Sequence, residues 1–360
     1  MNQTQGNTSE CGHFVNVDSY MVLTISQEIA VAVLCFTLGA FCILENSLVL
    51  FLIFTSSHLR KKPSYLFISS LALADLLASV IFVYSFVDFH VFKKPDSSSL
   101  FLFKLGGVIT SFTASLGSLL LTAFDRYICI HKPSAYKSTV TQRRAILALV
   151  VLWAITLIIA YLPLMGWNCC ALKSKCSELF PLIDKDYLCT WICVVLILLL
   201  AIFYAYIYVF WKARKHQQGM KSYQVQPGKA KMRMDIMLAK TLVLVQTVLV
   251  TCWSPVLFFM IYSLFTVLND DVKRVFAFCS TLCLVNSMIN PVIYALRTKD
   301  MRHELINKLF WCRKVLRIAG GTHNSVVDTV CDNTMQDTDG FVSSDVIILY
   351  PACNAQNHTT

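Results

Sequence analysis

The residues with the clearest chemical potential are two opposite charges at the end of an apolar stretch. From Phe112 the sequence reads FTASLGSLLLTAFDRYICIHKP, and it stays mostly small or aliphatic until Asp125 and Arg126. Charges at such an end can reach the membrane interface, so their burial costs little. A lone arginine there usually only anchors a helix end. The neighbouring acid and Tyr127 favour a second hypothesis, in which the ion pair acts as a conformational switch.

Asp75 lies deep inside another apolar stretch, where an isolated carboxylate would neutralise or find a partner. Two hypotheses stay open for it. In one, Asp75 is a sodium-binding acid, because hard cations prefer oxygen ligands. In the other, it belongs to a hydrogen-bond network between helices that holds no cation. Both hypotheses predict the same partners, which are Ser115 and either Asn286 or Asn290.

Two proline motifs follow along the chain, CWSP at 252–255 and NPVIY at 290–294. Pro255 removes a helical hydrogen bond and lets the chain kink beside the large indole of Trp253. The alternative is a static kink packed by Trp253. We favour a moving hinge, because both motifs follow the charged pair in order.

Phe82, Phe86, Phe89 and His90 recur at helical spacing and give one helix face an aromatic lining. Such a stripe usually packs in a core, but His90 at its outer end also suits a ligand-binding wall. The next apolar span begins near Lys104 and has no aspartate at this end, which argues against amine ligands. A single lysine at a helix end can extend to water.

Three cysteines, Cys169, Cys170 and Cys176, lie in one loop, whereas the outer end of the span after Lys104 contains none. In an oxidising external space we expect a small ring inside the loop. Cys176 would close it with either Cys169 or Cys170.

The elements that position these residues are membrane helices. The chain has 360 residues, of which 56% are apolar and only 14% charged, unlike an ordinary soluble domain. Apolar spans of about 20 residues cross a bilayer of about 30 Å. They are rich in Leu, Ala and Val, which favours helices over barrel strands. The expected fold is an all-α bundle of seven transmembrane helices, near 27–54, 63–89, 100–124, 145–165, 187–211, 236–265 and 274–296.

Most of the 31 lysines and arginines follow spans one, three, five and seven, and the first 26 residues contain none. We therefore expect a multi-pass plasma-membrane protein with an extracellular amino terminus. Sequons at Asn2 and Asn7 would then be glycosylated. Most of the net charge of +10 is expected to face anionic inner-leaflet lipid, and no nucleic-acid partner needs to be invoked.

The expected organisation is an external segment (1–26), the seven-helix domain (27–297), an interfacial eighth helix (298–318) and a disordered cytoplasmic tail (319–360). The eighth helix places Met301, Leu305 and Leu309 on one face and most basic residues elsewhere. Cys312 near its end is a weak candidate for palmitoylation. Tail serines and threonines are either phosphorylated by receptor kinases for arrestin capture or simply solvated.

Asp-Arg-Tyr after the third span, CWSP in the sixth and NPVIY in the seventh resemble the rhodopsin-like G-protein-coupled receptors. Within that superfamily, the proline-free fifth span, the missing third-span cysteine and the segments KKPSYLFI (61–68), YLPLMGW (161–167), CSELFPLI (176–183) and FAFCS (276–280) look like the cannabinoid receptors. The likeness covers about residues 27–300. The short external segment is more similar to the type 2 than to the type 1 members. The insert between Cys170 and Cys176 and the tail depart from the pattern.

This resemblance implies a receptor for lipid endocannabinoids that lowers adenylyl cyclase activity through inhibitory G proteins. The implied ligand-binding residues are Phe82, Phe86, Phe89, His90, Val108, Phe112, Phe180, Trp191, Trp253, Val256, Phe276 and Ser280. The implied switch residues are Asp125, Arg126, Tyr127, Asp235, Asn290, Pro291 and Tyr294. Asp125, together with Asp235, is expected to pair with Arg126 at rest.

Two other classes of membrane protein fit these features less well. A receptor for charged lysophospholipids is the nearer rival, although such receptors pair an arginine with a glutamate where this chain has Lys104-Leu105. A transporter or channel is disfavoured, because no inverted repeat or series of mid-membrane charges is present. No enzymatic activity and no cofactor are expected.

Overall fold

The structure is a computed structural model, and it describes residues 20, 22–88, 96–132, 134–221, 229–297 and 299–319. Within these ranges the side chains of residues 86, 130, 213, 216–221, 229–246, 294–297, 299 and 311–319 are not described. The described chain is helical apart from turns, short irregular stretches and isolated β-bridges, two of which lie in the loop before α8.

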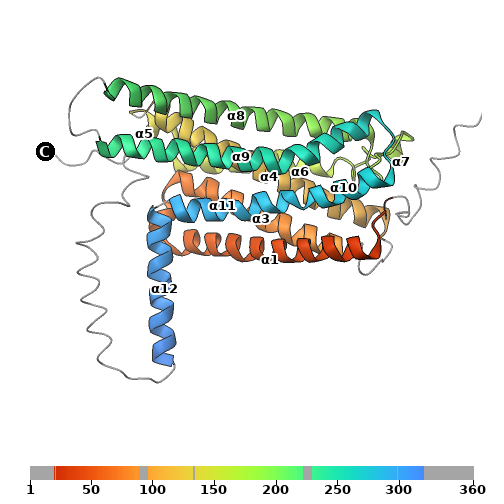
Figure 1. The fold of residues 1–360 in the computed structure, drawn as a ribbon, viewed down its shortest axis with the longest axis horizontal. Helices are drawn as coiled ribbons and strands as arrows, with labels where there is room; N and C mark the ends of the chain where they lie inside the picture. Colours follow the sequence, from red (N-terminus) through yellow and green to blue (C-terminus); the bar gives the residue numbers. More distant parts are fainter. Residues whose placement is uncertain are drawn as a thin grey trace, which may run out of the picture.

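Long helices lie side by side in one bundle, and α12 turns away from their direction at one end and projects past α1 (Figure 1). The helices are α1 (Ile25–Thr55), α2 (Ser57–Arg60), α3 (Pro63–Phe86), α4 (Ser98–His131), α5 (Tyr136–Thr139), α6 (Gln142–Tyr161), α7 (Cys169–Leu172), α8 (Lys185–Lys221), α9 (Lys229–Phe265), α10 (Asp270–Ser280), α11 (Leu282–Arg297) and α12 (Lys299–Ala319). Seven stretches in the described chain are long and apolar enough to cross a membrane. This confirms the predicted fold class.

The helices begin where the sequence supplies caps. Thr24 forms a capping box with Gln27 at the start of α1, and Ser97 caps α4. Pro63 stands in the first turn of α3, where its missing N–H is not needed. These caps and the first-turn proline lie where the apolar spans begin, so local sequence signals and hydrophobicity predict the same helices.

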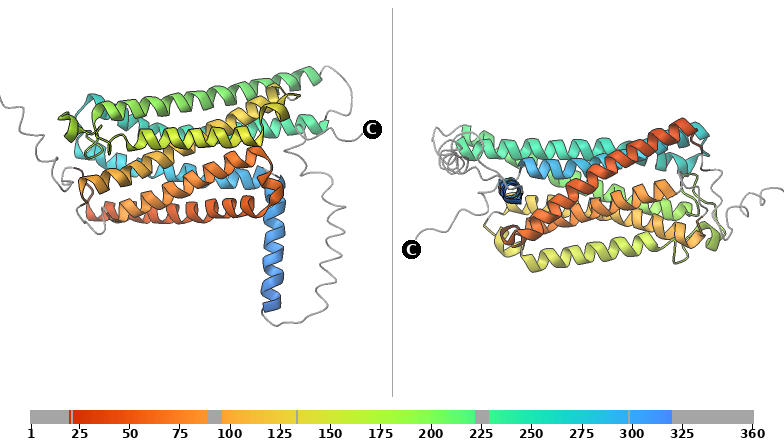
Figure 2. Two further views of the ribbon diagram at one scale, coloured as in Figure 1. Left: turned by 180° about the vertical axis from the view of Figure 1, so that it is seen from behind. Right: turned by 90° about the horizontal axis from the view of Figure 1, so that it is seen from below.

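α4 is the most buried of the seven spans, and it packs against α3, α6 and α8. Figure 2 shows α1 crossing the bundle obliquely and α12 seen nearly end-on. The outward faces carry exposed large apolar side chains, for example Phe36 on α1 and Leu147 on α6. Such a surface suits lipid rather than water.

The seventh span departs from the expected single helix. It is divided at Thr281 into α10 and α11. The hydroxyls of Ser280 and Thr281 donate to the carbonyls of Ala277 and Phe278, both at 2.7 Å. Hydroxyl groups that bond to nearby carbonyls compete with the helical ladder, which explains a break at this point. By contrast, the proline-free α8 is one unbroken helix of 37 residues, and it continues ten residues beyond the expected span 187–211.

Side-chain contacts hold the start of α12 against the bundle. Asp300 accepts from Lys62 and from the Tyr65 hydroxyl, and Glu304 accepts from Ser56 at 2.9 Å. Met301 is buried at the same contact. α12 spans almost the residues expected for the interfacial helix.

Candidate functional site

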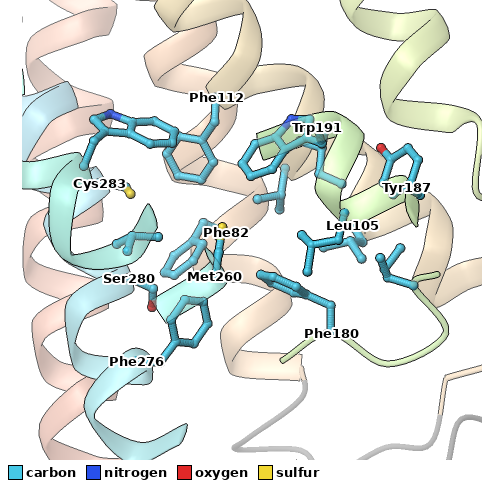
Figure 3. Close-up of a pocket in the computed structure, with 16 residues that line it drawn as sticks. Phe82, Leu105, Phe112, Phe180, Tyr187, Trp191, Met260, Phe276, Ser280 and Cys283 are labelled. Atoms are coloured by element: carbon cyan, nitrogen blue, oxygen red, sulfur yellow. The ribbon is translucent and has the colours of Figure 1, made fainter. Parts of the chain in front are cut away.

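An apolar pocket lies between α3, α4, α8, α9 and α10–α11, beneath the loop that precedes α8 (Figure 3). No lining residue carries a formal charge at neutral pH, and seven of the sixteen are aromatic. The lining residues are Phe82, Leu105, Val108, Ile109, Phe112, Phe180, Ile183, Tyr187, Leu188, Trp191, Trp253, Val256, Met260, Phe276, Ser280 and Cys283.

Aromatic rings in edge-to-face contact form the inner part of the pocket. The ring centroid of Phe112 lies 5.8 Å from that of Trp253 and 6.4 Å from that of Phe82. Trp253 belongs to the turn of α9 that contains Pro255. A ligand that contacts these rings therefore touches the helix segment in which proline weakens the backbone ladder.

A hydrogen bond fixes the indole of Trp191 on the α8 side. Its Nε1 donates to Oγ1 of Thr113 at 3.0 Å, and Thr113 in turn donates to the carbonyl of Ile109 at 2.7 Å. Both Trp191 and Thr113 are buried. Thr113 does not line the pocket, so it acts by positioning a residue that does.

The loop before α8 forms the outer cover of the pocket. A disulfide joins Cys169 to Cys176, which settles the choice that the sequence left open between Cys169 and Cys170. Cys176 forms a β-bridge with Asp184, and the ring of Phe180 meets Phe276 edge-to-face at 5.8 Å. An aromatic side chain of this loop, that of Phe180, therefore contacts the seventh span.

Asp184 joins this loop to α8. Its carboxylate accepts from the backbone N–H groups of Asp186 and Tyr187 at 3.0 and 3.1 Å, and also from the hydroxyl of Ser174. Asp184 is buried and had not been singled out from the sequence. An acid immediately before a helix, with its side chain bonded to the first turn, is the signal that could have identified it.

Nine of the twelve predicted ligand-binding residues line this one pocket. Phe89 and His90 lie outside the described residues, as does the side chain of Phe86. Sequence reasoning missed Leu105 and Ile109, although both stand at helical spacing from Val108 and Phe112 on α4. A ligand role for the whole set remains a prediction.

Lys104 does not extend into water as expected. Its side chain is only 11% exposed and forms salt bridges with Asp88 and Asp96. The distance from Nζ to Oδ2 of Asp96 is 2.8 Å, and the ammonium also lies 5.2 Å from the ring centre of Tyr84. The earlier expectation failed because both acids are separated from Lys104 in sequence, and only the fold brings them together.

Asp75 lies in a fully buried polar cluster between α3, α4 and α11. Its Oδ1 accepts from Ser115 at 2.7 Å and from Ser287 at 2.9 Å, and its Oδ2 accepts from Asn290 at 3.0 Å. Asn286 is buried nearby but donates no hydrogen bond to this carboxylate. The carboxylate and the hydroxyls of Ser115 and Ser287 are hard oxygen ligands that fit sodium, whereas Asn290 faces Asp75 with its Nδ2, and the direct contacts equally form a hydrogen-bond network between helices.

At the other end of α4, Asp125 is buried and collects three partners. Its Oδ2 lies 2.8 Å from Arg126 and accepts from Ser64 at 2.9 Å, and its Oδ1 accepts from Tyr136 at 2.6 Å. Burial and the adjacent carboxylate raise the pKa of the Tyr136 phenol, so it stays protonated as a donor. The predicted pair of Asp125 and Arg126 is therefore present.

The other predicted switch residues are only partly described. Tyr127 stacks on His131 with ring centroids 5.5 Å apart, and Pro291 lies within α11. The side chains of Asp235 and Tyr294 are outside the described residues, so pairing of Asp235 with Arg126 remains a prediction.

Comparison with known proteins agrees with this architecture. The protein-family model described as "7 transmembrane receptor (rhodopsin family)" matches residues 45–294 of this chain. The chain is 55% identical over 315 residues to cannabinoid receptor 1 of Taricha granulosa, covering 83% of this chain and 67% of that protein. It is 52% identical over 327 residues to cannabinoid receptor 2 of Mus musculus, covering 89% and 94%, respectively. For cannabinoid receptor 2 of Rattus norvegicus the identity is 54% over 309 residues, or 85% of each chain.

These matches include type 1 and type 2 members at similar identity, and they span the helices that build both the pocket and the Asp125 cluster. The chain thus belongs to the cannabinoid receptor family of rhodopsin-like, seven-transmembrane G-protein-coupled receptors.

Proposed function

We propose that this receptor is activated by neutral lipid endocannabinoids and acts through inhibitory G proteins to lower adenylyl cyclase activity. The observation that carries the proposal is the uncharged, largely aromatic lining of the pocket. Its hydroxyl groups are already used within the protein, since Ser280 donates to Ala277 and Tyr187 donates to Ile159. Such a surface favours a ligand held mainly by its apolar tail.

Activation follows from a shift between two conformations. An agonist stabilises the conformation whose pocket it fits better, and it can shift the equilibrium only by that difference in affinity. The contact between Phe112 and Trp253 transmits the difference to α9 at Pro255. The cytoplasmic end of α9 then moves outward and opens a cavity for the G-protein α subunit.

The remaining partners follow from the family and from the charge distribution of the sequence. The amino terminus is extracellular and glycosylated at Asn2 and Asn7, which precede the described residues. Receptor kinases and arrestin act on the tail after residue 319. Two hypotheses stay open for Asp75, namely sodium bound at rest and a hydrogen-bond network without a cation. The protein acts as a receptor rather than as an enzyme.

The rival ligand class, charged lysophospholipids, fits this pocket less well. A phosphate needs clustered, charge-assisted donors. Leu105 offers none, and the ammonium of Lys104 is already paired with two carboxylates. A transporter is disfavoured as well, because the chain belongs to a receptor family along most of its length.

The direct test expresses the full chain and records activation of a panel of G-protein α subunits on addition of 2-arachidonoylglycerol. We expect activation of inhibitory subunits and a fall in cyclic AMP. An Arg126→Ala variant should retain binding but lose activation, and it serves as the control for signalling through this receptor. Activation by lysophosphatidic acid with no response to 2-arachidonoylglycerol would overturn the proposal.

A further inference from the structure

Lys104 stands at the outer rim of the pocket. It precedes Leu105 directly, and it lies one helical turn outward from Val108 on the same column of α4. Both Leu105 and Val108 line the pocket. The head group of a lipid whose tail fills the pocket from this end would therefore reach the level of Lys104.

Two acids from different parts of the fold enclose its ammonium. Asp88 follows α3, and Asp96 immediately precedes Ser97, the residue that caps α4. Asp96 approaches Nζ with both oxygens, at 2.8 and 3.1 Å, and Asp88 forms the second bridge. Each acid side chain is 15% exposed, so these are not the exposed surface pairs that water screens almost completely.

The charges of this triad do not balance. One ammonium faces two carboxylates, so these three described side chains together carry a net charge of −1, whereas Lys104 alone would supply +1. Because the groups are partly buried, an approaching phosphate or carboxylate feels this difference more strongly than it would in bulk water. A neutral glycerol or amide head group feels little of it.

We propose that Asp88 and Asp96 form a charge filter that neutralises Lys104 and excludes lipids with acidic head groups from the pocket. This inference rests on the proposed function, since it assumes that the pocket binds a lipid tail. It adds to that function the residues that discriminate between two lipid classes of the same chain length. Without the two acids, Lys104 becomes a free cation that recruits an anionic head group.

The experiment compares two lipids with the same tail, 2-arachidonoylglycerol and 2-arachidonoyl lysophosphatidic acid, on the full-length receptor. Displacement of a neutral fluorescent cannabinoid measures binding, and G-protein activation measures response. The variants are Asp88→Asn, Asp96→Asn, the double variant, and the double variant combined with Lys104→Gln. Asp271→Asn is the matched control, because it removes one acid that is 81% exposed and pairs with Arg274 on α10 rather than with Lys104.

We expect the double variant to bind the phosphate lipid about tenfold more tightly, with the affinity for the neutral lipid unchanged within about threefold. The gain should disappear when Lys104→Gln is added, and Asp271→Asn should show none. Asp96→Asn alone should give a smaller gain, and it keeps the test available if the double variant does not reach the surface.

Two results would overturn the filter. One is an unchanged ratio of the two affinities in both Asp96→Asn and the double variant, and the other is a gain that persists with Lys104→Gln. Binding of 2-arachidonoylglycerol to the wild-type protein distinguishes failure of the proposed function from failure of this inference. If the wild type fails to bind 2-arachidonoylglycerol, the proposed function falls, whereas the filter is judged by the change in the affinity ratio among the variants.

Discussion

The hydroxyl of Tyr136 donates a hydrogen bond of 2.6 Å to Oδ1 of Asp125, while Arg126 and Ser64 contact Oδ2 of the same carboxylate. The short helix α5 thus takes part in holding Asp125 in place. We expect Tyr136→Phe to raise basal G-protein turnover about two- to tenfold, because a hydrogen bond to a charged group contributes about 1.5–3 kcal/mol and part of that is lost from the resting state. Basal nucleotide exchange at equal surface expression is the measurement.

Tyr262→Phe is the matched control for this prediction, since Tyr262 is exposed on the outer part of α9, far from Asp125 along the chain. Equal basal turnover in Tyr136→Phe and wild type would show that the contact does not restrain the switch.

Asp235→Ala should also raise basal signalling. If Asp235 pairs with Arg126 only at rest, its removal destabilises that state alone, by about 1 kcal/mol or less when the pair is solvated, which corresponds to at most about a fivefold change. Asp270→Ala removes an exposed acid of α10 and should leave basal turnover unchanged. No difference between these two variants would remove Asp235 from the switch.

Cys176→Ser should weaken cannabinoid binding tenfold or more, as an order of magnitude, because an anchored loop loses less entropy when Phe180 meets the ligand. Cys193→Ser, which replaces an exposed free thiol on α8, is the control. The measurement is the cannabinoid affinity, taken from binding isotherms on protein that has reached the cell surface. Normal affinity in Cys176→Ser would mean that the ring does not position Phe180.

Thr113→Val should lower agonist affinity about three- to tenfold, since the buried indole N–H of Trp191 would lose its acceptor. Thr113→Ser keeps the hydroxyl and should bind normally. The effect of Thr113→Val should nearly vanish in a Trp191→Phe background, which has no indole N–H to satisfy. If the two substitutions reduce agonist affinity additively in the double variant, Thr113 does not act through its hydrogen bond to Trp191.

Asp75→Asn distinguishes the two hypotheses for the buried cluster. If sodium binds there at rest, raising NaCl at constant ionic strength should reduce agonist affinity in the wild type and have no such effect in Asp75→Asn, because an amide lacks the charge that holds the cation. Potassium chloride is the control for ionic strength. If the wild type has equal agonist affinity in both salts, the cluster is a hydrogen-bond network that binds no sodium.

The sequence predicted what depends on local pattern. Hydropathy located the seven spans, and a charged motif located the pair of Asp125 and Arg126. The resemblance to the cannabinoid receptors supplied most of the pocket residues. Contacts created by tertiary folding were missed. Ser287 is an ordinary serine until α11 brings it to Asp75, and the partners of Lys104 are identified only once the chain before α4 folds back.

The covalent ring in the outer loop closes within the loop, and Asp184 attaches that loop to the first turn of α8. The cover of the pocket and the fifth span therefore form one mechanical unit. A ligand that displaced Phe180 would therefore shift the first turn of α8, a single helix of 37 residues that runs to the opposite end of the bundle. A receptor whose loop was bridged to α4 would instead couple the cover of the pocket to the most buried of its spans.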